Sequence, residues 1–525
     1  MNDENDENSE GQAMNVYGLW LWNLVMGCTT EAPVSEQPMV VLVSIDTLRA
    51  DHLSSYGYER QTSPFLDSLA DVGVRFEYAR SASPWTLPAH ATMLTGQLPS
   101  THHIVDDSVS LSAKTPILAE ELQKKGWGTG GVVSTMYVSS LFGFDRGFDF
   151  FEDFDLLSEK KNLSGTVDAE KIIDTALSWF SKQSAEKPLF LFLHFYDVHY
   201  AYEAPAPYDT KFDRASQKGD LRYKNYFHFK KKKVAQTQRD HQIAQYDEEI
   251  LYVDAQLKRL SDILTSKRTN VKWVVTADHG EEFWERGSWG HAHTLYSEQL
   301  HIPLIVSGAE IPTQVVDSGW VGNHDVAPMI AAWGEVSLEA DGIDLTKYFS
   351  GKEVLPERPM LAETTRFKTN RVSLFEGGYR LEWDLNTGKS ELFHTQDDLK
   401  ETKDLSNTEP EIAFAFKKRT EELLGKPWTA NSGGTVVLSR AVALKEGRHK
   451  VTMDVEKGDS FQVLPYDAPI SFQDSTGIKQ GPWYLVGGES VGQGSLQIEE
   501  QTATRVELDD AAKKKLEQLG YIQND

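Results

Sequence analysis

The sequence predicts an α/β fold with a mainly parallel central sheet flanked by helices. Two observations support this prediction: short apolar runs typical of buried strands recur along the chain, and segments with helical periodicity separate them. The chain has 525 residues, of which 40% are hydrophobic and 25% are charged. This length and composition indicate a globular protein with a large core and two or three domains.

The predicted strands are continuous apolar runs, as expected for strands that are buried on both faces. They cover Met39–Asp46, Pro188–Asp197, Val271–His279 and Ile302–Val306. The predicted helices carry apolar residues at helical spacing. They begin at Ser63 and Pro64, where Phe65, Leu69 and Val72 share one face, and also cover Asp168–Phe180 and Ile250–Leu264.

The part of the chain after residue 350 has a different pattern. Arg371–Trp383 predicts a hairpin around a Gly-Gly turn, and Glu411–Leu424 predicts a helix. A glycine-containing linker, Asn431–Gly434, precedes strand-like alternation at Val451, Met453 and Val455. We therefore expect three parts after the N-terminal segment: a main α/β domain at 38–350, a smaller α+β subdomain at 351–428 and a β-rich appendage at 429–525.

The charge of the chain limits its partners. A formal net charge of -26 argues against a nucleic-acid-binding protein, because neutralising phosphates requires a basic surface. A local exception is the basic run Phe229–Val234, which lies in a polar segment from about Tyr208 to Gln245. We expect a solvated loop there, and the alternative is a lid or an anion-attracting rim.

The single cysteine excludes an intrachain disulfide and a cysteine-rich metal site. Cys28 ends the apolar run Val16–Gly27, which is too short to span a bilayer. Leu24–Cys28, LVMGC, resembles the lipobox of bacterial lipoproteins, whose signal peptide is cut before a lipidated cysteine. The resemblance implies a signal segment at 1–28, a membrane anchor on Cys28 and a periplasmic or surface location in the cell envelope.

The residues before that apolar run depart from the lipoprotein pattern. The first thirteen, MNDENDENSEGQA, are acidic, whereas a secretion signal requires a positive segment. A start at Met14 also supplies no Lys or Arg before the apolar run. The alternative interpretation is therefore a buried or disordered tail that contains a cysteine by chance.

The stretch Thr86–Gly96, TLPAHATMLTG, predicts a short helix. Pro88 suits the first turn, and Gly96 is a plausible stop. Thr86 then lies just before the helix N-terminus, where backbone N–H groups and the helix dipole favour an anion or a partly ionised hydroxyl. Threonine is also a common N-cap, so both roles remain open.

Several predicted strands end in acidic or imidazole side chains. In open parallel sheets, ligands bind beyond the carboxyl ends of the strands, so these groups can meet in one crevice. Three of them, with a threonine oxygen, offer the donors that hold a divalent cation. The alternative for each is a polar residue that faces water. The strand-end residues are Asp46, His194, Asp197, Asp278 and His279.

Motifs in a fixed order resemble the sulfatase family of the alkaline phosphatase superfamily, over roughly residues 38–425. They are VSIDTLRAD (Val43–Asp51), TLPAHATMLTG (Thr86–Gly96), FYDVH (Phe195–His199), ADHGE (Ala277–Glu281), GHAHTLY (Gly290–Tyr296) and the C-terminal ELFHTQDDL (Glu391–Leu399) followed by Asp404 and Leu405.

The resemblance implies a role for each matching position. Asp46, Thr86, Asp278 and His279 match the ligands of one divalent metal ion, which is Zn, Mn, Mg or Ca. Thr86 also matches the nucleophile that opens the family signature. The other candidate catalytic residues are His90, His199 and His291, and the candidate substrate-binding residues are Arg49 and His293. For His199 and His291, a core histidine bonded to backbone is the alternative.

The departures from the family pattern bear on the chemistry. Sulfatases have Cys or Ser at the signature position, modified to formylglycine, and Arg four residues later. Here these positions hold Thr86 and His90, and Thr47 replaces a usual aspartate. Formylglycine chemistry is therefore not available, and the pattern more closely resembles superfamily members that form a phosphothreonine, such as the phosphoethanolamine and phosphoglycerol transferases.

The expected function is a metal-dependent hydrolase of an anionic ester, either a sulfate or a phosphate or phosphonate. An unmodified threonine favours phospho esters. One alternative is a transferase that passes the phospho group to an acceptor other than water. Another is a catalytically inactive binding protein that keeps the fold.

Overall fold

The computed structural model describes residues 34–107, 109–154, 167–213, 234–317, 319–385 and 387–424, together with the backbone of strands between 426 and 505. The predicted lipid anchor Cys28, the basic residues Phe229–Lys233 and the linker Asn431–Gly433 lie outside the described residues. No helix in the described part of the chain combines the length and apolarity that a membrane span needs.

A central sheet of nine strands confirms the predicted α/β class. Its order is β11-β2-β10-β7-β1-β6-β4-β5, and β12 pairs with β2. The strands are β1 Met39–Ile45, β2 Val74–Arg80, β4 Gly128–Val132, β5 Phe150–Glu152, β6 Leu189–Phe195, β7 Val271–Ala277, β10 His301–Gly308, β11 Gln314–Val316 and β12 Val321–Gly322.

The five strands β7-β1-β6-β4-β5 are parallel, whereas β10 runs antiparallel to both of its neighbours. After β7 the chain makes the small hairpin β8 (Glu282–Phe283) and β9 (Trp289–Gly290) and the short helix α8 (Ser297–Leu300). It then enters β10 from the edge at which β7 ended, so β10 runs in the opposite direction.

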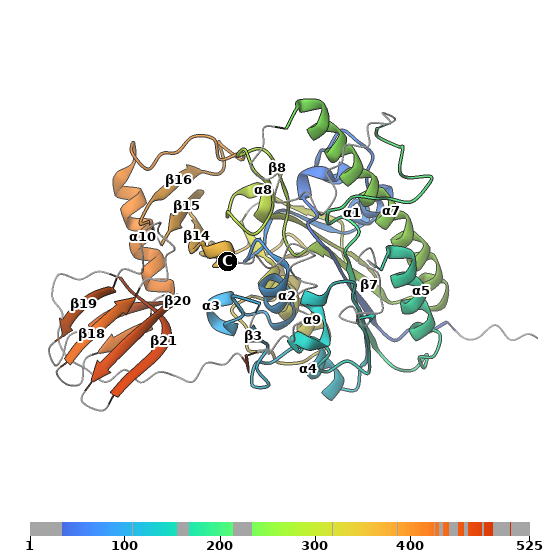
Figure 1. Cartoon of the computed structure of the whole chain (residues 1–525). Helices are drawn as coiled ribbons and strands as arrows, with labels where there is room; N and C mark the ends of the chain where they lie inside the picture. The colour runs from blue at the N-terminus through green and yellow to red at the C-terminus, as the bar shows by residue number, and fades with distance from the viewer. Residues whose placement is uncertain are drawn as a thin grey trace, which may run out of the picture. The chain divides into compact units, whose positions relative to one another are not determined.

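Helices cover both faces of the sheet (Figure 1). One group consists of α1 (Pro64–Val72), α5 (Ala169–Phe180) and α7 (Gln236–Lys267), in which α7 packs against both α1 and α5. The other group contains α2 (Thr86–Thr95), α3 (Pro99–His102), α4 (Leu118–Lys124) and α9 (Val326–Trp333). The predicted helices at Pro64 and after Asp168 are confirmed, and the Asp168 side chain caps α5 by accepting from Lys171 N.

One helix is longer than the sequence predicts. We expected Ile250–Leu264, whereas α7 begins at Gln236 and includes the last ten residues of the segment predicted as a solvated loop. The added turns bury polar side chains, among them Gln242, Asp247 and Glu248. The sequence of these turns has no apolar stripe that would indicate a helix. The predicted solvated loop was therefore wrong from Gln236 to Gln245.

The C-terminal part contains two antiparallel sheets. The first is formed by β13 (Met360–Thr364), β14 (Arg371–Glu376), β15 (Tyr379–Asp384) and β16 (Ser390–His394), and α10 (Pro410–Leu424) follows it. The predicted hairpin is β14–β15, whose turn residues Gly377 and Gly378 both have positive φ. The second sheet consists of β17 (Lys426–Thr429), β18 (Gly434–Ser439), β19 (Lys450–Val455), β20 (Ser460–Asp474) and β21 (Gly477–Val486). A short pair joins β3 (Val109–Ser110) to β22 (Thr504–Arg505).

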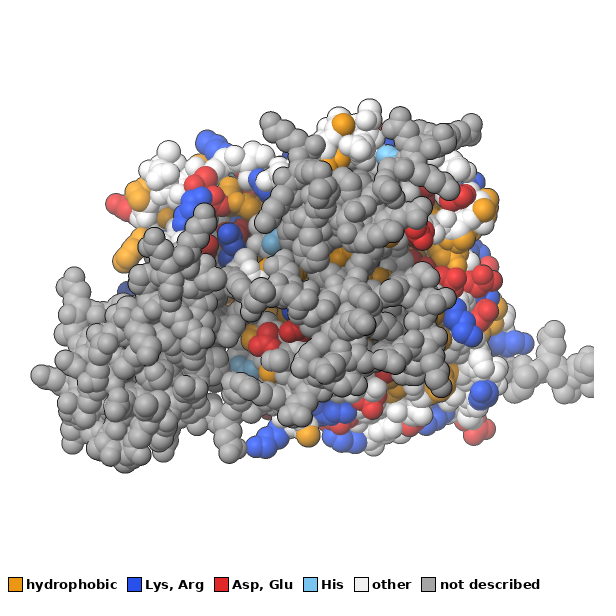
Figure 2. Space-filling view, in the orientation of Figure 1, with side chains coloured by type: hydrophobic (Ala, Val, Ile, Leu, Met, Phe, Trp, Pro, Cys, Tyr) orange, Lys and Arg blue, Asp and Glu red, His pale blue; other side chains and the backbone are white. Residues whose placement is uncertain are grey.

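The core lies around the middle of the nine-stranded sheet. Every residue of β1, β6 and β7 is buried, as the continuous apolar runs predict. On the described surface in Figure 2, acidic and basic side chains are interspersed. The polar groups that concern function are instead found at the carboxyl ends of the three buried strands.

Candidate active site

Three central strands bring their end residues to one edge of the sheet. Ile45 at the end of β1 is in register with Phe195 of β6 and Ala277 of β7. Asp46, Asp278 and His279 follow β1 and β7 directly, and all three are fully buried. The meeting of these groups agrees with the sequence analysis. Asp197, in contrast, accepts a hydrogen bond from Ala169 N at the start of α5.

Asp46, Asp278 and His279 offer three ligand atoms within 4.8 Å of one another. His279 Nε2 lies 3.7 Å from Asp46 Oδ1 and 3.3 Å from Asp278 Oδ2. The other ring nitrogen, Nδ1, lies 2.9 Å from Gly280 O, which accepts its hydrogen. Nε2 therefore presents its lone pair to the carboxylates, as a metal ligand does.

The carboxylates carry buried oxygens that lack hydrogen-bond partners: both of Asp46 and Oδ2 of Asp278. Burial raises the pKa of Asp46 to about 7, although His279 and the Thr86 hydroxyl act in the opposite direction. Burial and the neighbouring Asp46 also raise the pKa of Asp278. Because buried charges are costly unless they are paired or coordinate a metal, this donor set fits a divalent cation.

Thr86 is the first residue of α2, and its hydroxyl lies 3.4 Å from His279 Nε2. The N-cap position belongs to Trp85, and no side-chain hydrogen bond caps the helix. The expectation that Thr86 precedes the helix as its cap is therefore wrong. Its hydroxyl instead lies beside the carboxylate and imidazole cluster, and the predicted stop at Gly96 has the left-handed conformation.

His199 and His291 lie next to His279. The ring of His291 is 4.5 Å from that of His279 and 5.0 Å from that of His199. His199 Nδ1 is bonded to Tyr200 O at 2.8 Å, and His291 Nδ1 is bonded to Glu281 Oε1 at 3.0 Å. Burial lowers the pKa of His199 to about 3, so this ring is neutral at pH 7.

His90 and His293 make other contacts. His90 lies one turn along α2 from Thr86, with Nδ1 2.9 Å from Thr86 O and Nε2 2.9 Å from Ser44 Oγ. It thus contacts the Thr86 carbonyl instead of the hydroxyl, which does not favour the predicted catalytic role. His293 Nε2 is bonded to Glu282 Oε2 at 2.8 Å.

Arg49, a predicted substrate-binding residue, is held by contacts within the chain. Its guanidinium is bonded to both oxygens of Asp51, to Glu285 Oε1 and to the carbonyl of Glu281. Four of the five N–H donors of the guanidinium thus have partners within the chain. These contacts join the loop after β1 to the loop after β7, and substrate binding by Arg49 stays a prediction.

Two residues at the site had no assigned role in the sequence analysis. Glu281, in the quoted ADHGE motif, orients His291 and also accepts from Tyr202 OH at 3.2 Å. His194, recognised only as a strand-end residue, lies within β6 with Nε2 3.4 Å from Asp46 Oδ2. Their motif and strand positions were visible in the sequence, but their partners were not.

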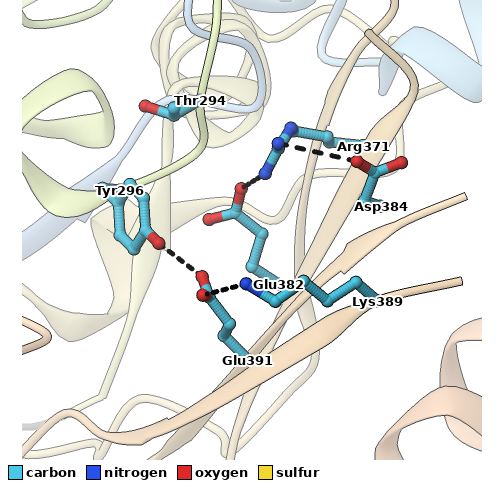
Figure 3. Close-up of a pocket in the computed structure, with 7 residues that line it drawn as sticks. All are labelled: Thr294, Tyr296, Arg371, Glu382, Asp384, Lys389 and Glu391. Carbon is cyan, nitrogen blue, oxygen red and sulfur yellow. Dashed lines mark hydrogen bonds and ion pairs between the residues drawn. The ribbon is translucent and has the colours of Figure 1, made fainter. Parts of the chain in front are cut away.

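A polar pocket of about 260 Å³ lies between the loop that follows His293 and the sheet of β14–β16 (Figure 3). Arg371 bonds Glu382 and Asp384, and Glu391 bonds Lys389 and Tyr296. The remaining residue of its lining is Thr294. Thr294 Oγ1 accepts from Gln299 Nε2, which also lies 3.3 Å from His293 Nε2, so polar contacts link the pocket to the histidine loop.

Comparisons with known proteins identify relatives of this chain. A family model described as Sulfatase matches residues 38–336. Ectonucleotide pyrophosphatase/phosphodiesterase family member 3 of Mus musculus is 26% identical over 36% of this chain and 22% of its own length. A choline-sulfatase of Rhizobium meliloti (strain 1021) is 23% identical over 60% of this chain and 72% of its own.

The fold is shared with solved structures. A phosphonate monoester hydrolase from Silicibacter pomeroyi superposes with a TM-score of 0.61 and 20% identity, over 74% of this chain and 95% of its own. The chain spans only about a fifth of the length of the ectonucleotide pyrophosphatase relatives that it matches.

Proposed function

We propose that this chain, which belongs to the sulfatase family of the alkaline phosphatase superfamily, hydrolyses phosphoric or phosphonic esters with Thr86 as nucleophile. The observation that carries the proposal is the place of the Thr86 hydroxyl, at the start of α2 and 3.4 Å from His279 Nε2 within the Asp46–Asp278 cluster. The names of its relatives, a choline-sulfatase and a phosphonate monoester hydrolase, agree with an anionic ester substrate.

Asp46, Thr86, Asp278 and His279 would hold a divalent cation, which lowers the pKa of a bound hydroxyl and stabilises charge on the transferred group. Thr86 loses its hydroxyl proton to water, and its Oγ forms a bond to phosphorus while the bond to the leaving oxygen breaks. His291, bonded to the Glu281 carboxylate, donates the proton that the leaving oxygen takes up. Water then attacks the phosphothreonine and returns a proton to His291, the bond from phosphorus to Thr86 Oγ breaks, and the released Oγ takes up a proton from water.

The preference for phospho esters follows from the nucleophile. A formylglycine hydrate expels sulfate by eliminating to the aldehyde, because it carries two oxygens on one carbon. Thr86 has a single hydroxyl, so a sulfuryl group on it requires a second attack at sulfur. A phosphothreonine is opened by water while the N–H groups at the start of α2 stabilise the developing charge.

Matched aryl phosphate, phosphonate and sulfate esters test this proposal. We expect phospho esters to be turned over fastest, and Thr86→Ala to lose at least about 10³-fold in kcat because the nucleophile is removed. Mass spectrometry of acid-quenched enzyme should find phosphate on the Thr86 peptide. The control is Thr95→Ala in the same helix, whose hydroxyl bonds Ala91 O and whose loss should change activity less than about threefold.

Robust sulfate release without phosphatase activity, or full activity in Thr86→Ala, would show that the nucleophile is assigned wrongly. Acceptor-dependent turnover with little hydrolysis would instead identify a transferase. Both outcomes are read in the same assays, with glycerol and ethanolamine added as trial acceptors.

We also propose that the mature protein is anchored in the cell envelope through a lipid on Cys28. The support is the lipobox-like LVMGC at the end of a short apolar run. Labelled fatty acid should be incorporated by the native protein and not by Cys28→Ser. Equal labelling of the two proteins would refute the anchor.

A further inference from the structure

A second group of donors adjoins the candidate cation site. His90, His194 and Asp278 are fully buried and offer ligand atoms within 4.8 Å of one another. Asp278 belongs to both groups, and the proposed reaction gives His194 no task. The two donor sets therefore form one continuous cluster at the ends of β1, β6 and β7.

The carboxylates of this cluster face histidines on two sides. Asp46 Oδ1 lies 3.7 Å from His279, whereas Asp46 Oδ2 lies 3.4 Å from His194 Nε2. Asp278 Oδ2 lies 3.3 Å from His279 Nε2 and 3.6 Å from His90 Nδ1. Two ligands of one tetrahedral cation with bonds of about 2.0–2.1 Å are about 3.3–3.4 Å apart, which is close to these separations.

The facing atoms lack the contacts that a metal-free core would supply. His194 Nε2, Asp46 Oδ2 and Asp278 Oδ2 are buried and have no hydrogen-bond partner. Their separations exceed the usual length of about 2.7–3.2 Å for an imidazole–carboxylate hydrogen bond. Because buried polar atoms are normally hydrogen-bonded or bound to a metal, these three atoms indicate a ligand between them.

His90 can present a lone pair on the same side. Its Nε2 lies 2.9 Å from Ser44 Oγ, and a hydroxyl accepts a hydrogen bond as readily as it donates one. With the proton on Nε2 and bonded to Ser44, His90 Nδ1 faces Asp278 Oδ2 as an acceptor. A metal-ligating histidine usually donates its second N–H in this way. This tautomer gives up the contact of Nδ1 with Thr86 O.

We propose that His90, His194 and Asp278, with Asp46 Oδ2, form a second cation subsite, so that the loaded protein holds two divalent ions bridged by Asp46 and Asp278. Imidazole and carboxylate ligands together suit Zn²⁺ or Mn²⁺. Two divalent ions carry more positive charge than the two carboxylates neutralise. An anionic ester would balance the remaining positive charge. The proposal rests on the cation site of the proposed function, but not on the proposed nucleophile.

Metal content tests the subsite independently of activity. Metal-free protein is loaded with Zn²⁺, freed of excess by gel filtration and analysed for zinc per chain. We expect two ions in the native protein and one in His194→Ala and in His90→Gln. The control is His102→Gln, a fully buried histidine bonded to Thr92 Oγ1, which should keep both ions.

Crystals of the zinc-loaded native protein provide a second measurement that needs no variant to fold. Anomalous scattering at the zinc edge should give two peaks, one beside His279 and one beside His194. A single peak beside His279, or one zinc per native chain that His194→Ala leaves unchanged, would overturn the subsite. Failure of the proposed function is seen separately, as activity retained by Thr86→Ala.

Discussion

Three histidines of the candidate site are each oriented by a hydrogen bond of the Nδ1 atom. His279 uses Gly280 O, His199 uses Tyr200 O, and His291 uses a carboxylate oxygen of Glu281. These partners determine which ring nitrogen carries the proton. The Nε2 atoms are then the ones that face a cation or substrate. His291 is distinct in this set, because a carboxylate partner stabilises its cationic form.

Glu281→Gln should therefore impair proton transfer while leaving the fold intact. The Nδ1–Oε1 distance is 3.0 Å and Glu281 is fully buried, so an amide removes the charge that supports protonated His291. We expect kcat to fall by about 10²-fold, with KM changed little and the basic limb of the pH profile shifted to lower pH, because the general acid His291 loses its proton more easily.

The matched control is Glu285→Gln on the same loop. Its carboxylate is partly exposed and pairs with Arg49, and its loss should reduce kcat less than about threefold. Equal losses in the two variants would show that Glu281 acts only by holding the loop in place.

At the scale of single elements, the prediction succeeded where a strand is buried on both faces. β1, β6 and β7 are such strands, and their apolar runs identify them without ambiguity. β4 was missed because its sequence, GTGGV, contains three glycines. In the structure a Cβ on Gly130 would lie 2.6 Å from the Trp179 ring, so the absent side chain makes room for α5.

The first half of α7 was missed for a related reason. Its buried positions are polar and find partners on distant segments, as when Asp247 bonds His52, Tyr58 and Arg60. Hydrophobic periodicity carries no signal for such a face. The helix can be recognised only when the hydrogen-bond partners of its buried polar side chains are known.

The packing of α7 on α1 depends on one carboxylate. Asp254 of α7 is buried and accepts hydrogen bonds from Phe65 N and Leu66 N, the first N–H groups of α1. Asp254→Ala leaves these donors unsatisfied and should lower the free energy of unfolding by about 2 kcal/mol. Urea unfolding measures this change. Asp262→Ala, an exposed position on the same helix, should change it by less than about 0.5 kcal/mol.

At the scale of the whole molecule, the site was predictable to the extent that it lies at strand ends. Asp46, Asp278 and His279 follow from topology, and the family resemblance added Thr86, His199 and His291. The contacts of Arg49 and His90 were not predictable, because their partners come from loops and strands far away in the sequence. Sequence patterns specify which groups reach an edge of the sheet, but not which of them bind one another.

The sheet of β13–β16 supports the loops of the site. Arg380 of β15 is fully buried and donates to the carbonyl of Leu295, two residues beyond His293. Ser83, before α2, donates to Glu363 O of β13 at 3.0 Å. The loop that carries the histidines and the start of the nucleophile helix are therefore both held by the C-terminal part of the chain.

Glu363 makes this junction sensitive to pH. The side chain is buried, its Oε1 accepts from Ser100 Oγ of α3, and its Oε2 has no partner. Burial raises its pKa from 4.5 to about 8, so the folded protein binds this proton more tightly than the unfolded chain. The contribution to stability is complete below about pH 4.5 and is lost as the pH rises towards 8.

Glu363→Gln should remove this dependence, because the amide resembles the protonated acid. We expect the variant to match the native protein at pH 4.5 and to exceed its free energy of unfolding by roughly 3–5 kcal/mol at pH 8.5, where the native carboxylate is buried with its charge. Urea unfolding across this range, with chelator present so that metal binding does not contribute, measures the difference. Glu353→Gln, at an exposed position, should follow the native curve. If Glu363→Gln were instead destabilised equally at every pH, the junction would depend on the shape of the side chain and not on its proton.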